Sequence, residues 1–142
     1  MKTSEACIAE IKELEGYRET AYQDPKGIWT VGYGWTQGVH AGTTMTESAA
    51  DQALRARIGQ IERAIAAAVE VPLTQGQFDA LVDFEYNLGR GSFDHSELRK
   101  LLNKRQYRAA AEQFPRWCHA GDQTLPGLLK RRLVEEGWFL AA

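Results

Sequence analysis

Three polar side chains near the start of the chain are of types, and at spacings, that could act together in catalysis. Glu15 ends an apolar helical pattern, Asp24 opens the turn sequence Asp-Pro-Lys-Gly, and Thr30 follows in the returning strand. A carboxyl group in an apolar setting can stay protonated and act as a general acid. A second carboxylate beside it can stabilise positive charge or activate a water. The hydrolysis of a glycosidic bond requires this pair of functions.

The position of Glu15 follows from helical periodicity. The apolar residues of the first helix form one stripe at about 100° per residue: Cys7, Ile8, Ile11 and Leu14. Glu15 falls inside this stripe, so we expect it to face the core. Burial and the negative end of the helix dipole would both disfavour its ionised form. The structural alternative is a buried glutamate that an arginine holds in an ion pair.

Asp24 and Thr30 each have an ordinary structural interpretation. Asp commonly begins turns, because its side chain accepts hydrogen bonds from backbone amides two residues on. Asp24 in such a turn would also be a fixed negative charge. Thr30 alternates with Trp29 and Val31, so its hydroxyl should point to the opposite face of the strand. Two glycines in the following Val-Gly-Tyr-Gly sequence would let a bulky ligand approach the backbone closely.

Hydrophobic periodicity and end signals divide the chain into one hairpin and several helices. The hairpin is expected over residues 20–36, where two strand-like runs flank the turn. The expected helices cover residues 4–15, 46–69, 75–88, 94–103, 106–118 and 127–139. No other strand is expected, and residues 37–45 and 120–127 are interpreted as loops.

Two capping boxes support the starts of two of these helices. Thr74 with Gln77 precedes the helix that ends at Gly89, and Asp94 with Glu97 precedes the short helix that follows. In each box, a side chain before the helix and one in its first turn bond reciprocally to backbone amides.

The layout predicts an α+β chain that is mostly α and has two lobes in one domain of residues 1–142. We expect a hairpin lobe at about 15–45, a connecting helix at 46–71, and a helical lobe at 72–142 packed with the N-terminal helix. There are no repeats, low-complexity tracts or interdomain linkers. Two-lobed chains commonly hold ligands between their lobes.

Composition and charge argue against several classes of protein. Apolar residues make up 44% and charged residues 25% of the chain, as in soluble globular proteins. The net charge of −2 gives no electrostatic signature of nucleic-acid binding. The first residues contain no long apolar run, so we expect neither a signal peptide nor a membrane anchor. Cys7 and Cys118 lack zinc-site spacing, and we expect two reduced thiols, with a single disulfide as the alternative.

Together with the residues after Thr30, the polar set resembles a known family. The pattern E-x8-D-x5-T followed by "VGYGWT" resembles the phage-type lysozymes of glycoside hydrolase family 24, the endolysins of tailed phages and prophages. Other resembling segments follow in the same order over nearly the whole chain: "PLTQGQFDALVDFEYNLGRGSF", "FPRWCHAG" and "GLLKRRLVEEGWF". The resemblance implies a two-lobed lysozyme-like fold.

The resemblance also implies a reaction and a role for each residue. Glu15 would be the general acid, Asp24 the second carboxylate, and Thr30 the group that helps to place the attacking water. The substrate would be peptidoglycan, cleaved at the β-1,4 bond between N-acetylmuramic acid and N-acetylglucosamine, so that the bacterial host is lysed. The family is mainly inverting, which requires room for a water opposite the leaving group.

Further expectations concern the substrate cleft and the partners. Tyr33, Thr36 and Asn87 fall at positions that resemble cleft-lining residues, with packing in a strand, a loop and a helix end as the alternative. We expect no cofactor and no metal. The partner would be the glycan strand, without nucleic acid or stable membrane insertion. We expect a monomer made in the host cytoplasm, which acts on the periplasmic wall after release that depends on a holin.

Two positions depart from the family pattern. Trp35 replaces a His that is usually a structural ion-pair partner, so activity should survive while the pH dependence of stability changes; stacking on a sugar ring is the alternative. Glu85 lies on the apolar stripe of its helix, so we expect it to face the core, and it stands where relatives usually carry a small or apolar residue. We expect it to pair with an arginine such as Arg131 or Arg132, the alternative being a rival acid. The negative net charge is also unusual for an enzyme that acts on an anionic wall.

Four functional hypotheses fit these observations. The first is a muramidase that lyses its host, and the second is a wall-remodelling, tail-associated or secreted lysozyme. The third, a lytic transglycosylase, needs no hydrolytic water, so the presence of both Asp24 and Thr30 argues against it. The fourth is a catalytically inactive wall-binding or scaffold module, which the intact set with Glu15 disfavours.

Overall fold

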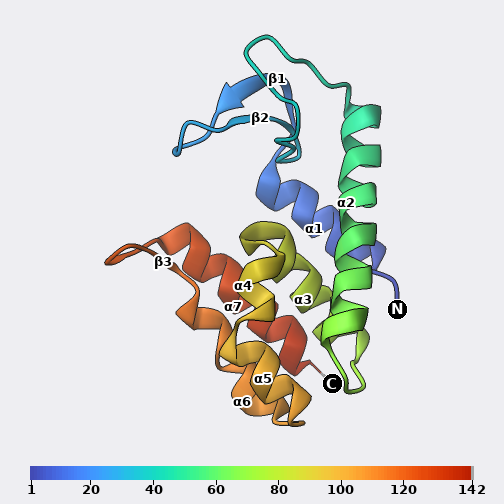
Figure 1. Cartoon of the computed structure of the whole chain (residues 1–142), viewed down its shortest axis with the longest axis vertical. Helices are drawn as coiled ribbons and strands as arrows, with labels where there is room; N and C mark the ends of the chain where they lie inside the picture. The colour runs from blue at the N-terminus through green and yellow to red at the C-terminus, as the bar shows by residue number, and fades with distance from the viewer. Residues whose placement is uncertain (142) are drawn as a thin grey trace. The chain divides into compact units, whose positions relative to one another are not determined.

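The computed structural model describes residues 1–141 and has an α+β fold that is mostly α, as predicted (Figure 1). The helices are α1 (Glu5–Glu15), α2 (Glu47–Ala68), α3 (Gln75–Leu88), α4 (Arg90–Asp94), α5 (Glu97–Asn103), α6 (Tyr107–Ala111) and α7 (Pro126–Leu140), with a 3-10 turn η1 (Phe114–Arg116). The strands are β1 (Arg18–Gln23), β2 (Trp29–Gly32), β3 (His119–Ala120) and β4 (Gln123–Thr124). Within these 141 residues, no helix has the length and apolar character needed to cross a membrane.

The chain divides into two compact units. One unit comprises residues 5–59, with α1, the β1–β2 hairpin and the first part of α2. The other comprises residues 1–4 and the chain from Gln60 onward, with the end of α2 and all later elements. The three catalytic candidates therefore belong to the first unit.

In the first unit, α1 is tied to α2 by charged side chains. Lys12 lies 2.5 Å from Asp51, and Arg55 reaches both Asp51 and Glu5 at 3.1 Å. Burial contributes as well, because Ile11 of α1 is fully buried. These contacts fix the helix whose last residue is the candidate acid.

The β1–β2 hairpin is antiparallel and follows the expected turn. Tyr22 pairs with Thr30 and Gln23 with Trp29, and the register is irregular between Arg18 and Tyr22. The hairpin confirms the predicted strand region, although β1 begins earlier than the predicted start at residue 20.

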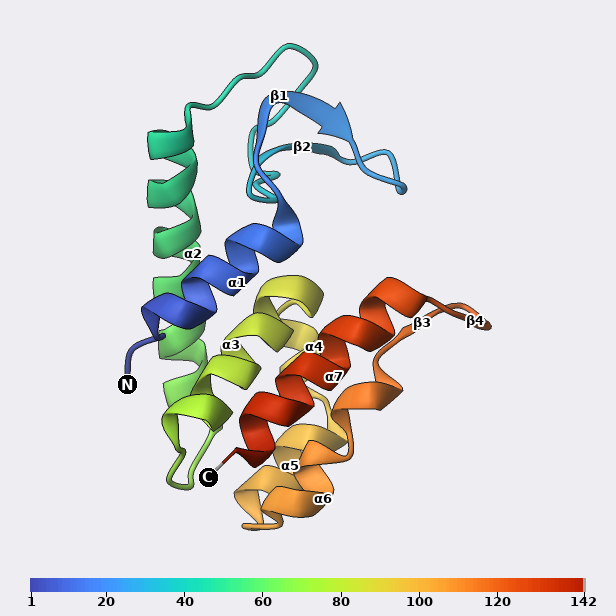
Figure 2. The same ribbon diagram turned by 180° about the vertical axis from the view of Figure 1, so that it is seen from behind.

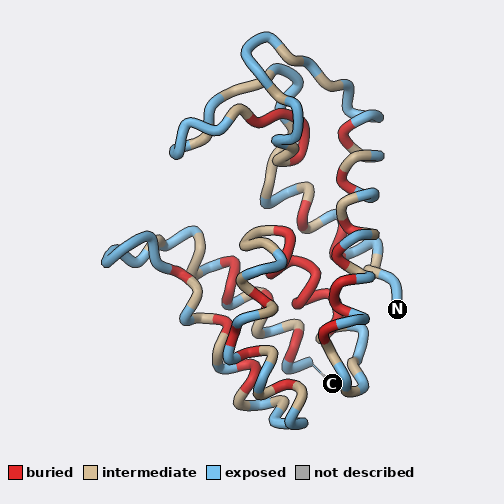
Figure 3. The backbone as a smooth tube through the Cα atoms, viewed as in Figure 1, coloured by how far each residue is buried: buried red, intermediate tan, exposed pale blue. Residues whose placement is uncertain are grey.

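In the second unit, α3 and α7 lie side by side, as both views of the ribbon show (Figures 1 and 2). Phe84 at the centre of α3 contacts a cluster of aromatic rings in edge-to-face arrangements, with centroids 5.7 Å from Phe114 and 6.4 Å from Phe93. Figure 3 shows the long run of buried residues along α3. This helix is the centre of the core of its unit.

The ends of α3 match the sequence signals. Thr74 accepts a hydrogen bond from the Gln77 amide, and the Gln77 side chain accepts one from the Thr74 amide, which confirms the predicted capping box. Gly89 follows the helix at φ 92°, in the left-handed region that glycine tolerates best. Thr46 caps α2 in a similar way, by accepting a hydrogen bond from the Ala49 amide.

The predicted capping box at Asp94 is wrong. Ser96 is the residue immediately before α5, and its side chain accepts a hydrogen bond from the Arg99 amide. Asp94 instead ends α4, a short helix that was not predicted, and accepts a bond from Arg90 Nε at 3.3 Å. The signal was misplaced because serine is as good a cap as aspartate, and a short helix separated the two candidates.

The predicted helix over residues 106–118 is shorter. It ends at Ala111, and η1 follows, because Pro115 has no backbone amide to continue an α-helix. The loop predicted over residues 120–127 contains part of a small second hairpin, in which His119 pairs with Thr124. Its strands carry no alternation of buried and exposed residues, so periodicity could not reveal them.

Both cysteines lie in the part of the chain that the structure describes. Cys7 is 2% and Cys118 is 4% exposed, and they form no disulfide with one another.

Candidate active site

The hairpin turn fixes the carboxylate of Asp24. Oδ1 accepts hydrogen bonds from the amides of Lys26 at 2.8 Å and Ile28 at 2.9 Å, as the turn sequence predicts. The main chain closes the same turn, since the Asp24 amide donates to the Ile28 carbonyl and the Gly27 amide to that of Asp24. Oδ2 makes no hydrogen bond within residues 1–141. One oxygen is therefore anchored, and the other can serve a ligand or a water.

Thr30 lies on the strand that returns from this turn. It is 5% exposed, and its hydroxyl donates to the Ile28 carbonyl at 3.0 Å. Because that bond uses the hydroxyl proton, the oxygen retains lone pairs that can accept a hydrogen bond from water. The side chain is thus held as an acceptor a few residues from the fixed carboxylate.

Glu15 is the last residue of α1 and is partly buried. Gly16 ends the helix at φ 71°, and its amide donates to the Lys12 carbonyl. The predicted apolar stripe is confirmed at Cys7, Ile8 and Ile11, which are buried. It is not confirmed at Leu14, which is 39% exposed. In its last turn the helix is covered by fewer neighbours, so the stripe ends before the acid.

The carboxyl group of Glu15 lies against the backbone of Gly34. A Cβ at position 34 would stand 2.9 Å from Glu15 Oε1, and Gly34 has φ 85°. Both conditions select glycine. The turn that carries Gly34 is closed by two main-chain bonds between Val31 and Trp35, at 2.9 and 2.8 Å. The hairpin and the candidate acid are thus in direct contact.

Arg57 of α2 is a member of this site that the sequence analysis missed. Its Nη1 donates to the Gly34 carbonyl at 3.4 Å, so a guanidinium approaches the residue that the acid touches. Arg57 lies on the same helical face as Leu54 and Ile61, which are buried. A charged residue within an apolar stripe, the signal that identified Glu15, could have identified Arg57 as well.

Trp35 is held within its own loop. Its indole N–H donates to the Gln37 carbonyl at 3.1 Å. The change in the pH dependence of stability that we expect from this position remains a prediction.

The two other candidates from this segment differ in exposure. Tyr33 is 7% exposed, with its ring centroid 5.8 Å from that of Tyr17 and 5.6 Å from Lys12 Nζ. Thr36 is exposed and lies just after the closed turn. Packing therefore accounts for most of the surface of Tyr33, whereas Thr36 is open to solvent.

Asn87, the last cleft-lining candidate, belongs to the second unit and to a network of buried charges between α3 and α7. It accepts a hydrogen bond from Arg132 Nη2 at 2.8 Å, and Arg132 Nε lies 2.7 Å from Glu135 Oε1. A second ion pair of the network joins Arg131 to Asp83, with an Nη2 to Oδ1 distance of 2.6 Å.

The two acids of this network have shifted pKa values. Burial and a hydrogen bond with Asp83 raise the pKa of Glu135 well above its ordinary value. Burial opposes ionisation of Asp83, yet hydrogen bonds with Glu135 and Arg131 hold its pKa below the ordinary value.

The predicted partner of Glu85 is wrong. Glu85 is 2% exposed, and neither carboxyl oxygen has a hydrogen-bond partner among residues 1–141. Arg131 and Arg132, the expected partners, are instead paired with the two acids of the α3–α7 network. Burial, and then the negative charge of Asp94, raise the pKa of Glu85 to about 7.

Comparison with known proteins now decides the family. The sequence profile described as Phage lysozyme matches residues 12–135, a range that contains all three catalytic candidates. The chain belongs to the phage lysozyme family.

Relatives of this phage lysozyme cover its full length. It is 40% identical to an endolysin of Acyrthosiphon pisum secondary endosymbiont phage 1, with 100% of each chain covered. It is 37% identical to an endolysin of Salmonella phage P22, with 99% of each chain covered. Among solved structures, it resembles the muramidase domain of SpmX from Asticaccaulis excentricus, at 36% identity, 99% coverage of both chains and a TM-score of 0.90. These matches confirm the predicted lysozyme-like fold.

Proposed function

We propose that this phage lysozyme cleaves the β-1,4 bond between N-acetylmuramic acid and N-acetylglucosamine, with Glu15, Asp24 and Thr30 as its catalytic residues. It is a peptidoglycan hydrolase of the muramidase type, acting in host cell lysis. The geometry of the β1–β2 hairpin is the main support for these assigned roles. It anchors one oxygen of a carboxylate, orients a hydroxyl as an acceptor, and places Gly34 against the carboxyl of Glu15.

In this mechanism each residue has a separate task. Glu15 donates a proton to the leaving glycosidic oxygen, so that the bond breaks without expelling an alkoxide. Asp24 uses its open oxygen to accept a proton from the attacking water, while the hydroxyl of Thr30 accepts the second hydrogen bond of that water. Attack from the face opposite the leaving group inverts the anomeric carbon.

The remaining candidates would contact the sugar chain. We propose that Thr36 and Asn87 bind the glycan through their polar side chains, and that Tyr33 does so through the small part of its surface left exposed. The working unit would be a single catalytic domain spanning residues 1–142.

The assignment of Glu15 can be tested on outer-membrane-permeabilised Gram-negative cells. Purified wild-type protein should reduce their turbidity. Glu15→Gln should clear the cells about 10²–10⁴-fold more slowly, which is the range that general acids contribute. Thermal unfolding of both proteins provides the control, because the two side chains are nearly isosteric. Equal clearing by the two proteins would remove Glu15 from the mechanism.

Mass spectrometry of the products tests the reaction type. Reducing muramic acid ends are expected from hydrolysis. Products with 1,6-anhydro ends would identify a lytic transglycosylase and reject the role given to Thr30 and Asp24.

We also propose that the enzyme is a monomer made in the host cytoplasm and that a holin releases it to the periplasmic wall. Light scattering of the purified protein measures its mass. Expression with and without a co-expressed holin tests release, since lysis should occur only when the holin is present. Lysis by the enzyme alone would reject this dependence.

A further inference from the structure

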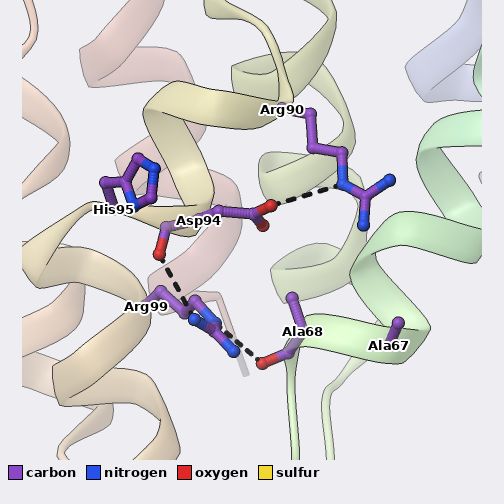
Figure 4. Close-up of a pocket in the computed structure, with 6 residues that line it drawn as sticks. All are labelled: Ala67, Ala68, Arg90, Asp94, His95 and Arg99. Atoms are coloured by element: carbon purple, nitrogen blue, oxygen red, sulfur yellow. Dashed lines mark hydrogen bonds and ion pairs between the residues drawn. The ribbon is translucent and has the colours of Figure 1, made fainter.

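The second unit contains an open cavity of about 320 Å³ where the end of α2 meets α4 and α5 (Figure 4). The lining residues are Ala67 and Ala68 from α2, Arg90 and Asp94 from α4, His95 just after α4, and Arg99 from α5. Half of the lining residues are therefore charged, and two of these carry guanidinium groups.

Two guanidinium groups in this wall are anchored but retain donors. Arg99 donates from Nε to the Ala68 carbonyl at 3.0 Å and from Nη1 to the Asp94 carbonyl at 3.2 Å. Arg90 donates from Nε to Asp94 Oδ2 at 3.3 Å, as the dashed lines in Figure 4 show. Their other N–H groups make no hydrogen bond within residues 1–141. A pair of oriented guanidinium groups with free donors suits a planar or tetrahedral oxyanion.

A second observation makes this cavity different from an ordinary basic surface. Glu85 is buried with both oxygens unpartnered, and Asp94 Oδ1 is a further buried oxygen without a partner in the described chain. The charges that act on Glu85 are those of Asp94 and Arg90, which are two of the residues lining the cavity. The ionisation of Glu85 is thus coupled to the wall of the cavity.

The other elements packed around α3 leave this coupling intact. The arginines of α7 are occupied by the buried acids of their own network, and Arg99 of α5 is bound to carbonyl groups. The end of α2 contributes only Ala67 and Ala68. His95 is the remaining titratable group of the cavity and is exposed.

The net charge of Arg90, Arg99, Asp94 and Glu85 taken together therefore depends on one proton. With His95 neutral, the two arginines and Asp94 give a net charge of about +1 when Glu85 is protonated and about 0 when it is ionised. An anion bound beside Arg90 and Asp94 would repel an ionised Glu85 carboxylate, whereas it would not repel the protonated form.

We propose that this cavity binds a small oxyanion, a carboxylate or phosphate-like group, between Arg90 and Arg99, and that Glu85 takes up a proton as the anion binds. The site lies entirely within the second unit and does not rest on the catalytic roles proposed above. By linkage, the anion binds more tightly as the pH falls, because protonated Glu85 is the form that accepts it.

Isothermal titration calorimetry with two probes tests the site, since neither sulfate nor oxalate changes its own charge appreciably between pH 6 and 8. With Glu85 half protonated near pH 7, the apparent affinity should rise by up to about tenfold from pH 8 to pH 6. Titrations at pH 7 in buffers of different ionisation enthalpy should show uptake of about half a proton per anion. Binding of sulfate alone favours phosphate-like ligands, and binding of oxalate alone favours carboxylates.

Three variants separate the contributions. Arg90→Gln should weaken binding at every pH, and because the Arg90 side chain is 67% exposed, its fold should be unaffected. Glu85→Gln should still bind the anion but lose the proton uptake. His95→Gln is the matched control, because it removes the other titratable side chain that lines the cavity, and it should retain most of the pH dependence.

Several results would overturn the proposal. Absence of binding by both probes, or equal binding by Arg90→Gln, would reject the anion site. Unchanged proton uptake in Glu85→Gln, or its disappearance in His95→Gln, would reject the role of Glu85. Thermal unfolding of each variant identifies any result that arises from misfolding.

Discussion

The acids of the hairpin and the acids of α3 are held in opposite ways. Asp24 receives its hydrogen bonds from amides two and four residues away and keeps one oxygen open. Asp83 is fully enclosed and is paired with Arg131, a residue 48 positions distant. Glu85, two positions after Asp83, is enclosed as well but has no partner in the described chain. A carboxylate with one anchored and one open oxygen can take part in chemistry, whereas the fold depends on an enclosed carboxylate keeping its partner.

The largest expected effect is the loss of the enclosed pair. Arg131→Met removes the ion-pair partner of the buried Asp83 carboxylate and should lower the free energy of unfolding by about 3–5 kcal/mol. Urea denaturation measures this change. The matched control is Arg90→Gln, which breaks an exposed pair and should cost less than about 1 kcal/mol. Similar losses for the two variants would remove the distinction between an enclosed and an exposed ion pair.

Asp24→Asn tests the open oxygen. Asparagine keeps an acceptor for the two amides of the turn, so the free energy of unfolding should change by less than about 1 kcal/mol. Turnover should fall about a hundredfold or more, because a neutral amide cannot take a proton from water. The ratio of clearing rates, with calorimetric unfolding alongside, gives both numbers. A variant with full activity would show that the second carboxylate is dispensable.

Glu85→Gln should change how stability depends on pH. The pKa of Glu85 is about 7 in the folded chain and near 4.5 without its environment. The folded state therefore holds the proton more tightly, and this contribution is complete below about pH 4.5 and is lost as the pH rises through 7. Between pH 4.5 and 8, wild type should lose roughly 1–3 kcal/mol more unfolding free energy than the variant. Parallel curves would show that Glu85 is solvated or paired.

Trp35→His should have the smallest effect. Turnover should stay within about twofold, and the free energy of unfolding should change by less than about 1 kcal/mol at pH 8. Below about pH 6 the variant should become less stable, because Arg57 at the neighbouring Gly34 disfavours a charged imidazole. Urea denaturation at pH 5 and pH 8 measures the difference. A variant that gains stability at low pH would show that an acid, rather than Arg57, governs this position.

The same contrast explains what the sequence could predict. The turn at Asp24, the cap at Thr74 and the end of α3 at Gly89 depend on neighbours a few residues away, and all three were predicted correctly. The periodicity of α3 also placed Glu85 in the core. Periodicity reports which face of a helix is buried, but it carries no information on which distant side chain completes an ion pair.

Other errors have local causes. The short α4 and the second hairpin lack the length or the alternation that produces a recognisable pattern. Arg57 was missed although it lies on the apolar face of its helix, because the sequence does not show that its partner is the Gly34 carbonyl of another element. Leu14 was placed in the core because the stripe was extended to the last turn, where neighbours no longer cover it.

The turn between Val31 and Trp35 has a consequence for sequence variation. Its two hydrogen bonds join main-chain atoms only, so the turn does not depend on the side chain at position 35. Any residue that tolerates this backbone can occupy the position while the glycine before it keeps its contact with the acid. Position 35 is therefore a place where substitutions can be screened for altered substrate preference at little risk to folding, and position 34 is closed to such a screen.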